Sequence, residues 1–310
     1  MIVLSKLLLE SVEERRDKIE NRFSVWSRDT VARHFEKVSK TYTEKPFLYI
    51  NGEEHRYGDI WDRAVDYAKS FIQLGVKRRD HIAILMENDA SFPSFMIAAS
   101  MVGAVFIPIN SMLTKEEVEY ILTQSDTKYL ILQEKVKDKQ HGQAVKELLS
   151  TPSFREHSNL EKVISFDAKE KELMDEHFLT WETFLNGAEA VSDSELNARW
   201  EQSRYPDEVA IIMYTSGSTG SPKGVMLTDD MLLRCAYGTV LSRAIEEGRV
   251  TFAPLPFYHC FAIVEAILAM SFVGGSVISA LGASPLKSLE LMEKYKQMII
   301  SACRPPSCPY

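Results

Sequence analysis

The chain has 310 residues, of which 45% are hydrophobic and 26% are charged, and its formal net charge at pH 7 is −8. This composition predicts a globular protein of one large domain or two ordinary ones, with enough apolar residues for a substantial core. The acidic balance argues against a nucleic-acid scaffold and favours a small-molecule partner.

The N-terminal stretch, residues 1–22, has an apolar run that is too short for a signal peptide and no basic region before it. The nearest approach to a membrane span is residues 260–275, but Glu265 stands in its middle, so a buried helix is expected there. We expect Glu265 to face solvent or to pair at a helix N-terminus rather than to be catalytic. These features predict a cytoplasmic protein without a transmembrane segment.

The four cysteines, Cys235, Cys260, Cys303 and Cys308, lack the spacing of a disulfide framework, and reduced thiols are expected. A zinc site at Cys303 and Cys308 is disfavoured, because no second pair and no nearby histidine would complete four ligands.

A regular alternation of strands and helices begins at residue 46. Residues 58–75 have the apolar stripe of a helix that ends at Gly75, and Thr114 with Glu117 forms the capping box of another helix. Pro93 suits the first turn of the helix between these two. This order is the signature of a parallel sheet covered by helices, with strands expected at 46–50, 81–86, 104–109 and 128–132.

Residues 134–205 are charged and weakly periodic, so we expect a looser connection there with one strand at 162–166. A second α/β unit follows the strand at 207–214. The pattern therefore predicts a first α/β subdomain, 1–205, with an N-terminal helical segment and the irregular connection, and a second, 206–310. The second has strands expected at 224–228, 249–254 and 275–280, and helices at 229–244, 261–273 and 285–295.

The last stretch, residues 298–310 (MIISACRPPSCPY), starts like another buried strand and becomes a Pro- and Cys-rich tail. A parallel sheet that stops within a unit leaves an unpaired edge. We therefore expect the second subdomain to be truncated.

Residues 213–228 (MYTSGSTGSPKGVMLT) combine glycines, hydroxyls and one lysine between two apolar segments. The Walker motif does not fit, because Pro222 precedes Lys223 and Gly224 follows it, and the dinucleotide fingerprint does not fit the glycine spacing. A plain structural loop is the alternative, but a two-strand turn needs only about two to five residues. The stretch therefore favours an anion-binding loop.

The same stretch resembles the signature loop of the AMP-forming adenylating superfamily, which includes acyl-CoA synthetases. Three further blocks, residues 55–88, 101–125 and 253–269, are similar to the family in order and spacing, and the resemblance covers about residues 25–300. Arg79 and Ala262 stand where the family usually has glycine. The matching loop positions are Thr215, Ser216, Gly217, Ser218, Thr219, Gly220, Pro222, Lys223 and Gly224.

The resemblance implies an α/β fold with two helix-covered, mostly parallel sheets, the incomplete large N-terminal domain of the adenylating fold without its C-terminal domain. It implies ATP-dependent activation of a carboxylic acid, most like a fatty acid, to an acyl-adenylate and then an acyl-CoA. The phosphates would bind at Thr215, Ser216, Gly217, Ser218, Thr219, Gly220, Lys223 and Gly224. The acyl or adenylate pocket would include His259, Tyr258 and Phe261, with Tyr258 and Phe261 equally suited to a core role.

The implied cofactors are ATP, Mg²⁺ and coenzyme A. The family's acidic magnesium ligand and its catalytic lysine lie in downstream motifs that these 310 residues do not contain, so neither a metal ligand nor a catalytic residue is assigned. We expect an acyl-CoA synthetase fragment that is inactive alone; the alternative is a non-catalytic nucleotide-binding protein or scaffold. Nucleic acid is not an expected partner, whereas peripheral membrane contact, oligomeric state, acyl chain length and thiol acceptor stay open.

Overall fold

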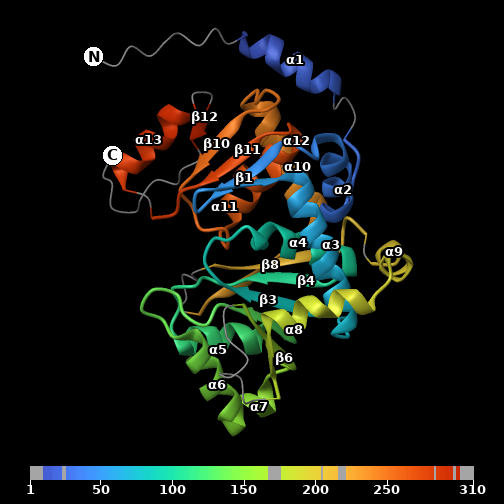
Figure 1. Ribbon diagram of the computed structural model, residues 1–310, viewed down its shortest axis with the longest axis vertical. Helices are drawn as coiled ribbons and strands as arrows, with labels where there is room; N and C mark the ends of the chain where they lie inside the picture. Colours follow the sequence, from blue (N-terminus) through green and yellow to red (C-terminus); the bar gives the residue numbers. More distant parts are fainter. Residues whose placement is uncertain are drawn as a thin grey trace.

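The computed structural model describes residues 10–22, 26–166, 176–203, 205–215, 221–282, 284–295 and 298–300. Its strands form two sheets (Figure 1). The seven-stranded sheet has the order β7-β6-β5-β3-β4-β8-β9, and the five-stranded sheet has the order β12-β10-β11-β1-β2. The strands are β1 Pro46–Ile50, β2 Glu53–Arg56, β3 His81–Leu85, β4 Val105–Pro108, β5 Tyr129–Leu132, β6 Lys162–Ser165, β7 Phe178–Thr180, β8 Val209–Thr215, β9 Lys223–Thr228, β10 Val250–Ala253, β11 Ser276–Ser279 and β12 Met298–Ile300.

Both sheets are mostly parallel, as the sequence predicts. The two antiparallel pairs among the described strands are β1 with β2 and β8 with β9. The described helices are α1 Val12–Arg22, α2 Val31–Tyr42, α3 Tyr57–Gln73, α4 Ser91–Val102, α5 Lys115–Gln124, α6 His141–Ser150, α7 Pro152–His157, α8 Trp181–Asn186, the 3₁₀ turn η2 Gly187–Ala190, α9 Asp193–Glu201, α10 Asp229–Ser242, α11 Cys260–Ala262, the π-helical turn η3 Ile263–Leu268, α12 Ala269–Phe272 and α13 Pro285–Lys294.

Three clusters of buried side chains define the layers. The largest lies between the two sheets and joins the inner face of each to α2, α3, α4 and α10. The second lies under the other face of the seven-stranded sheet, against α5, α6 and α7, and the third lies between the five-stranded sheet and α13. Figure 1 shows this arrangement, with α3 and α4 between the sheets and α5 to α7 at the lower end.

The chain crosses between the sheets twice. Strands β1 and β2 belong to the same sheet as β10 to β12, whereas β8 and β9 belong to the sheet of β3 to β7. A division at residues 205/206 therefore does not separate the two sheets. The physical reason is pairing: β1 is in parallel register with β11, and Leu48 lies opposite Val277.

In its described residues, the region expected to be a loose connection is regular, so that prediction was wrong, whereas the strand expected at 162–166 is confirmed as β6. Residues 134–205 contain α6, α7, α8 and α9 and two parallel strands, β6 and β7, which extend the seven-stranded sheet. Phe154, Val163 and Phe178 are at most 6% exposed. Charged residues are so frequent in this region that the few apolar positions of its core form no clear periodic pattern in the sequence.

Several local predictions are confirmed. Gly75 ends α3 with φ +90°, a conformation that favours glycine. The Thr114 hydroxyl accepts a hydrogen bond from the Glu117 N–H, and the Glu117 carboxylate accepts one from the Thr114 N–H. The strand expected from residue 298 onward is β12, Met298–Ile300, and residues 301–310 lie outside the described residues.

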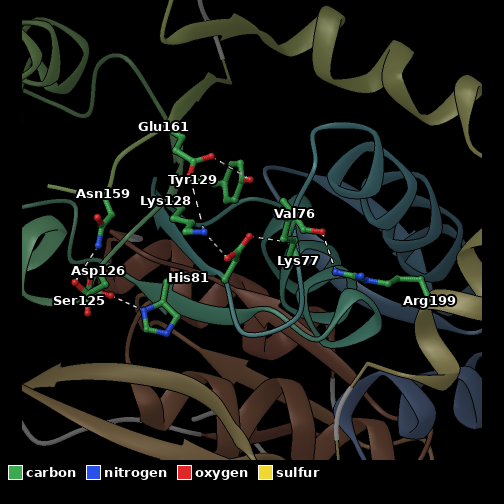
Figure 2. A network of polar contacts seen from close by, with 11 residues as sticks. Val76, Lys77, His81, Ser125, Asp126, Lys128, Tyr129, Asn159, Glu161 and Arg199 are labelled. Carbon is green, nitrogen blue, oxygen red and sulfur yellow. Dashed lines mark hydrogen bonds and ion pairs between the residues drawn. The ribbon is translucent and has the colours of Figure 1, made fainter.

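A network of polar groups lies at the amino edge of the seven-stranded sheet, where β3, β5 and β6 begin (Figure 2). Asp80 is 8% exposed; its carboxylate accepts from the Lys77 N–H at 2.8 Å and pairs with Lys128 Nζ at 2.8 Å. Lys128 also lies 3.8 Å from Glu161. The carboxylate thus joins the turn before β3 to the start of β5.

The same edge continues to β8 through Glu208, the residue before that strand. Its carboxylate pairs with Arg78 and Arg79 and accepts from the Tyr205 N–H at 3.0 Å. Burial raises the pKa of Glu208, but the hydrogen bonds from Arg79, the Tyr205 N–H and Arg78 outweigh it and lower the pKa to about 2. The charges at this edge are therefore paired with one another.

No helix in the described ranges is long and apolar enough to cross a membrane.

Candidate functional site

The glycine-rich stretch joins two antiparallel strands at the carboxyl edge of the seven-stranded sheet. The outgoing arm is β8, which ends at Thr215, and the return arm is β9, which begins at Lys223. Thr215 lies opposite Lys223, and the Thr215 hydroxyl is 3.5 Å from the Lys223 carbonyl oxygen. The predicted site residues Ser216, Gly217, Ser218, Thr219 and Gly220 lie outside the described residues.

The two described polar residues of the loop, Thr215 and Lys223, are exposed. Within the described part of the chain, no carboxylate forms an ion pair with the Lys223 ammonium group. A lysine without an ion-pair partner among the described residues, beside a hydroxyl at the edge of the sheet, provides a positive charge and hydrogen-bond donors for an external anion.

Gly224 permits the close approach of the two arms. A Cβ atom there would lie 2.9 Å from Ile212 Cγ2 and 3.3 Å from the ring of Tyr214, which lies opposite Gly224 in the register. The ring of Tyr214 therefore occupies the space that a side chain at position 224 would need. Burial raises the pKa of Tyr214 to about 12, so its hydroxyl stays protonated at neutral pH.

Helix α5 supports the loop from one side. The Tyr120 hydroxyl donates to the carbonyl oxygen of Pro222 at 3.1 Å, directly before Lys223. The Tyr214 hydroxyl donates to the Gln124 side-chain oxygen. Sequence reasoning missed Tyr120 and Gln124 as site residues, although the capping box at Thr114 had already placed their helix.

The second set of predicted residues follows β10. His259 is exposed and caps α11, because its Nδ1 accepts a hydrogen bond from the Phe261 N–H at 3.2 Å. With Nδ1 as the acceptor, the proton of the neutral ring is assigned to Nε2. Tyr258 and Phe261 are half-buried and pack against the large core, and burial, with the negative charge of Glu87, raises the pKa of Tyr258.

Ala262 and Glu265 follow in the same helical run. Ala262, in the place of the family's usual glycine, is fully buried in the large core. Glu265 lies in the π-helical turn with its side chain only 15% exposed, so neither a solvent-facing nor an N-terminal capping role is correct. It accepts from the Thr239 hydroxyl at 2.8 Å and pairs with Arg243 at 2.6 Å, which ties η3 to α10.

The loop and the His259 segment are on different sheets. No hydrogen bond or ion pair joins Thr215 or Lys223 to Tyr258, His259 or Phe261 within the described residues. The two carboxyl edges are instead connected by Asn88, which follows β3 and bonds to the segment after β10 at Leu255 and Phe257. In Figure 1, α11 lies on the side of the five-stranded sheet that faces β8.

Cavities of about 500 and 740 Å³ lie on either side of the β1–β2 turn. Neither cavity is lined by Thr215, Lys223 or His259.

The described ranges contain no group of three histidine, cysteine, aspartate or glutamate side chains suited to a metal ion. Cys235 and Cys260 are free thiols, and burial raises the pKa of Cys260. Cys303 and Cys308 lie outside the described residues.

Comparison with known proteins gives three findings. The 4-coumarate–CoA ligase CCL1 of Humulus lupulus is 30% identical over 271 residues, which cover 86% of this chain and 45% of the ligase. The crystal structure of the anthranilate CoA ligase AuaEII in complex with anthranoyl-AMP matches with a TM-score of 0.72 and 18% identity, covering 89% of this chain and 50% of that one. The O-succinylbenzoate coenzyme A synthetase MenE of Bacillus subtilis, in complex with ATP and magnesium ion, matches with a TM-score of 0.63 and 18% identity, covering 86% and 62%.

The structural matches show the fold that the sequence predicted. The chain spans about half or less of the length of the curated relatives it matches. The family model for AMP-binding enzymes matches residues 35–303, which include both the glycine-rich loop and the His259 segment. This chain belongs to the AMP-binding enzyme family.

Proposed function

We propose that this chain supplies the phosphate-binding part of an AMP-forming acid–thiol ligase. In the proposed reaction a carboxylate oxygen attacks the α-phosphorus of ATP, and pyrophosphate leaves with the electrons of the broken P–O bond. A thiolate, from coenzyme A, then attacks the acyl carbon and AMP leaves. The observation that carries the proposal is the β8–β9 hairpin, which presents the exposed Thr215 beside the exposed Lys223.

The loop's task in this reaction is electrostatic. Negative charge grows on the leaving pyrophosphate, and donors fixed in advance stabilise such charge without reorganisation. We assign the Lys223 ammonium and the Thr215 hydroxyl to this task, together with the hydroxyls and amides of residues 216–220 and the backbone at Gly224. Lys223 acts as a point charge rather than as a bidentate donor.

The segment after β10 is the proposed wall of the acid site, and we define the acid wall as residues 258–261. Tyr258 and Phe261 offer apolar ring surface, and the exposed His259 offers its Nε2 proton to a carboxylate or adenylate oxygen. This combination suits an acid with an apolar body. CCL1 and AuaEII are named for aromatic acids, 4-coumarate and anthranilate; a fatty acid is our proposal for this chain.

Magnesium is proposed to enter with ATP, where it would offset part of the negative charge of the phosphates. The described side chains form no cluster that would hold it alone. Coenzyme A is the proposed thiol, in line with the names of the ligases above.

Binding of ATP and of inorganic pyrophosphate to the 310-residue chain, measured by calorimetry, tests the proposal. Removing a charge-assisted hydrogen bond costs about 1.5–3 kcal/mol, so Lys223→Ala should weaken both affinities about 10- to 100-fold. Lys40→Ala is the matched control, because Lys40 is also exposed but lies on α2 and pairs with Glu36. Equal affinities for Lys223→Ala and the parent chain would contradict the assignment.

Release of pyrophosphate in the presence of ATP, Mg²⁺, coenzyme A and a panel of fatty and aromatic acids tests whether this chain is active alone. Turnover supports the ligase and identifies its acid. Nucleotide binding without turnover by this chain supports the nucleotide-binding or scaffold alternative, or a ligase part that is inactive alone. Absence of both binding and turnover would contradict all of these readings.

A further inference from the structure

Asn88 is the third residue after β3, and every polar atom of its side-chain amide is bonded. Its Nδ2 donates to the Leu255 carbonyl oxygen at 2.8 Å and to the Ser279 hydroxyl at 2.9 Å. Its Oδ1 accepts from the Phe257 N–H at 2.7 Å. The orientation of the amide is fixed by these partners, because a carbonyl oxygen can only accept and a backbone N–H can only donate.

The three partners all lie on the five-stranded sheet side, whereas Asn88 comes from the seven-stranded sheet. Leu255 and Phe257 follow β10, and Ser279 is the last residue of β11. The Asn88 amide donates to the carbonyl oxygen of Leu255, before Pro256, and accepts from the N–H of Phe257, after Pro256. A neighbouring β-strand would offer its backbone carbonyl and N–H groups in the same way. The Asn88 amide thus makes hydrogen bonds between the two sheets at a place where no backbone pairing joins the described strands.

The residues on both sides of the Asn88 contact are fixed by further contacts. The N–H of Glu87 donates to the side-chain oxygen of Gln133, which follows β5, at 3.0 Å. On the other side, Phe257 is fully buried, with its ring centroid 5.7 Å from that of Phe92 in α4. Both ends of the contact are therefore built on rigid parts of the fold.

The acid wall begins one residue after Phe257. The N–H of His259 donates to the carbonyl oxygen of Pro256 at 3.1 Å, so the residue that Asn88 brackets also sets the backbone at His259. The carboxyl edge that carries Asn88 is the edge that carries Thr215 and Lys223. We propose that Asn88 is a positioning residue that sets the distance between the acid wall and the end of the β8–β9 hairpin at Thr215 and Lys223; this rests on the proposed function.

Other residue types cannot reproduce this contact. Aspartate keeps an acceptor for the Phe257 N–H but turns a second oxygen toward the Leu255 carbonyl oxygen, with no donor between them. Alanine removes all three bonds and leaves the Phe257 N–H and Leu255 carbonyl without their partner. The pair of variants therefore separates the acceptor role of Asn88 from its donor role.

Amide hydrogen exchange of the 310-residue chain tests the contact directly. In Asn88→Ala the Phe257 amide should exchange at least about tenfold faster. The exchange rates of amides in β3 and β5 should change only as far as the free energy of unfolding changes. Asn88→Asp should restore part of the protection at Phe257. Asn159→Ala is the matched control: its side chain donates to Asp126 at 3.1 Å at the amino edge, and its loss should leave Phe257 unchanged. Phe257 exchange in Asn88→Ala that rises only in proportion to all other amides would overturn the proposal.

A binding measurement tests the functional half. The probes are inorganic pyrophosphate and two non-reactive adenylate mimics, decanoyl and benzoyl sulfamoyl-adenosine. Asn88→Ala should lower the affinity for the adenylate mimics about tenfold or more and change the affinity for pyrophosphate less than twofold. Equal loss for both probes, or for neither, would contradict a positioning role. If the parent chain binds no probe, the proposed function fails, and the exchange result at Phe257 still decides whether Asn88 holds the segment.

Discussion

The amino and carboxyl edges of the seven-stranded sheet use polar side chains in opposite ways. At the amino edge, the charges of Asp80, Lys128 and Glu208 are paired with neighbours that the fold itself supplies. Figure 2 shows the part of this edge around Lys128. At the carboxyl edge, neutral amides and hydroxyls hold the backbone, and the Lys223 charge has no ion-pair partner within the described residues. Removing one partner of a buried pair destabilises the fold, whereas an exposed charge without a partner among the described residues is available to a ligand.

The largest effect on stability is expected at Asp80. Asp80→Ala removes the acceptor of the Lys77 N–H and the nearest partner of the partly buried Lys128. Breaking a buried pair costs about 3–5 kcal/mol, and because Lys128 is about one-third exposed we expect about 2–3 kcal/mol. Urea unfolding measures this loss. Affinity for pyrophosphate at the opposite edge should not change in the folded protein.

Asp193→Ala is the control for Asp80→Ala. Asp193 also pairs with a lysine, Lys69 at 2.7 Å, but its side chain is 83% exposed. Its loss should cost no more than about 1 kcal/mol. Equal losses for the two variants would show that burial of Asp80 adds nothing, and the comparison of the two edges would lose its energetic basis.

Glu208 gives the amino edge a pH dependence. Its pKa is lowered from 4.5 in the unfolded chain to about 2 in the fold, so its stabilising contribution is complete above pH 4.5 and is lost as the pH falls toward 2. Glu208→Gln should therefore lower the free energy of unfolding by about 1–2 kcal/mol at pH 6, a value reduced for partial exposure. The difference from the parent chain should vanish near pH 2.

Thermal unfolding of both chains between pH 2 and pH 7 measures this difference. Glu161→Gln is a control with a weaker contact, since Glu161 lies 3.8 Å from Lys128 and is more exposed. A Glu208→Gln deficit that stays constant from pH 6 to pH 2 would mean that the Arg78 and Arg79 pairs do not depend on the charge of Glu208.

Much of this comparison could be predicted from the sequence, but unevenly. The hydrophobic periodicity, Gly75 and the Thr114 capping box predicted the alternation of strands and helices, because such signals are local. The loop at Thr215 and Lys223 was found because its glycines and hydroxyls are contiguous. The sheets to which β1 and β8 belong were not predicted, because strand pairing depends on contacts between residues far apart in the chain.

The supporting residues of the site were also missed, for a related reason. Asn88 bonds to residues 167–191 positions away, and Tyr120 bonds to a carbonyl 102 positions away. One signal for Asn88 was present: a polar side chain three residues after a buried strand, at the edge where parallel strands end. Tyr120 and Gln124 lie on the outer side of an amphipathic helix, where such residues are common and need no partner.

The smallest effect is expected at Tyr120, and it probes the carboxyl edge alone. Tyr120→Phe removes only the hydroxyl that donates to the Pro222 carbonyl oxygen, and the side chain is 37% exposed, so the fold should lose less than about 1 kcal/mol. If that bond fixes the return arm at Lys223, pyrophosphate affinity should fall about two- to fivefold, part of the worth of one hydrogen bond.

Calorimetry with Tyr120→Phe, Lys223→Ala and the double variant decides whether the hydroxyl acts through the lysine. Tyr205→Phe is the control, since Tyr205 is 71% exposed and lies at the other edge. If Tyr120 positions Lys223, the double variant should bind no more weakly than Lys223→Ala alone, because the hydroxyl has no charge left to position. Additive losses would instead mean that α5 supports the loop backbone independently of the lysine, and the carboxyl edge would then bind its anion mainly through amides and hydroxyls.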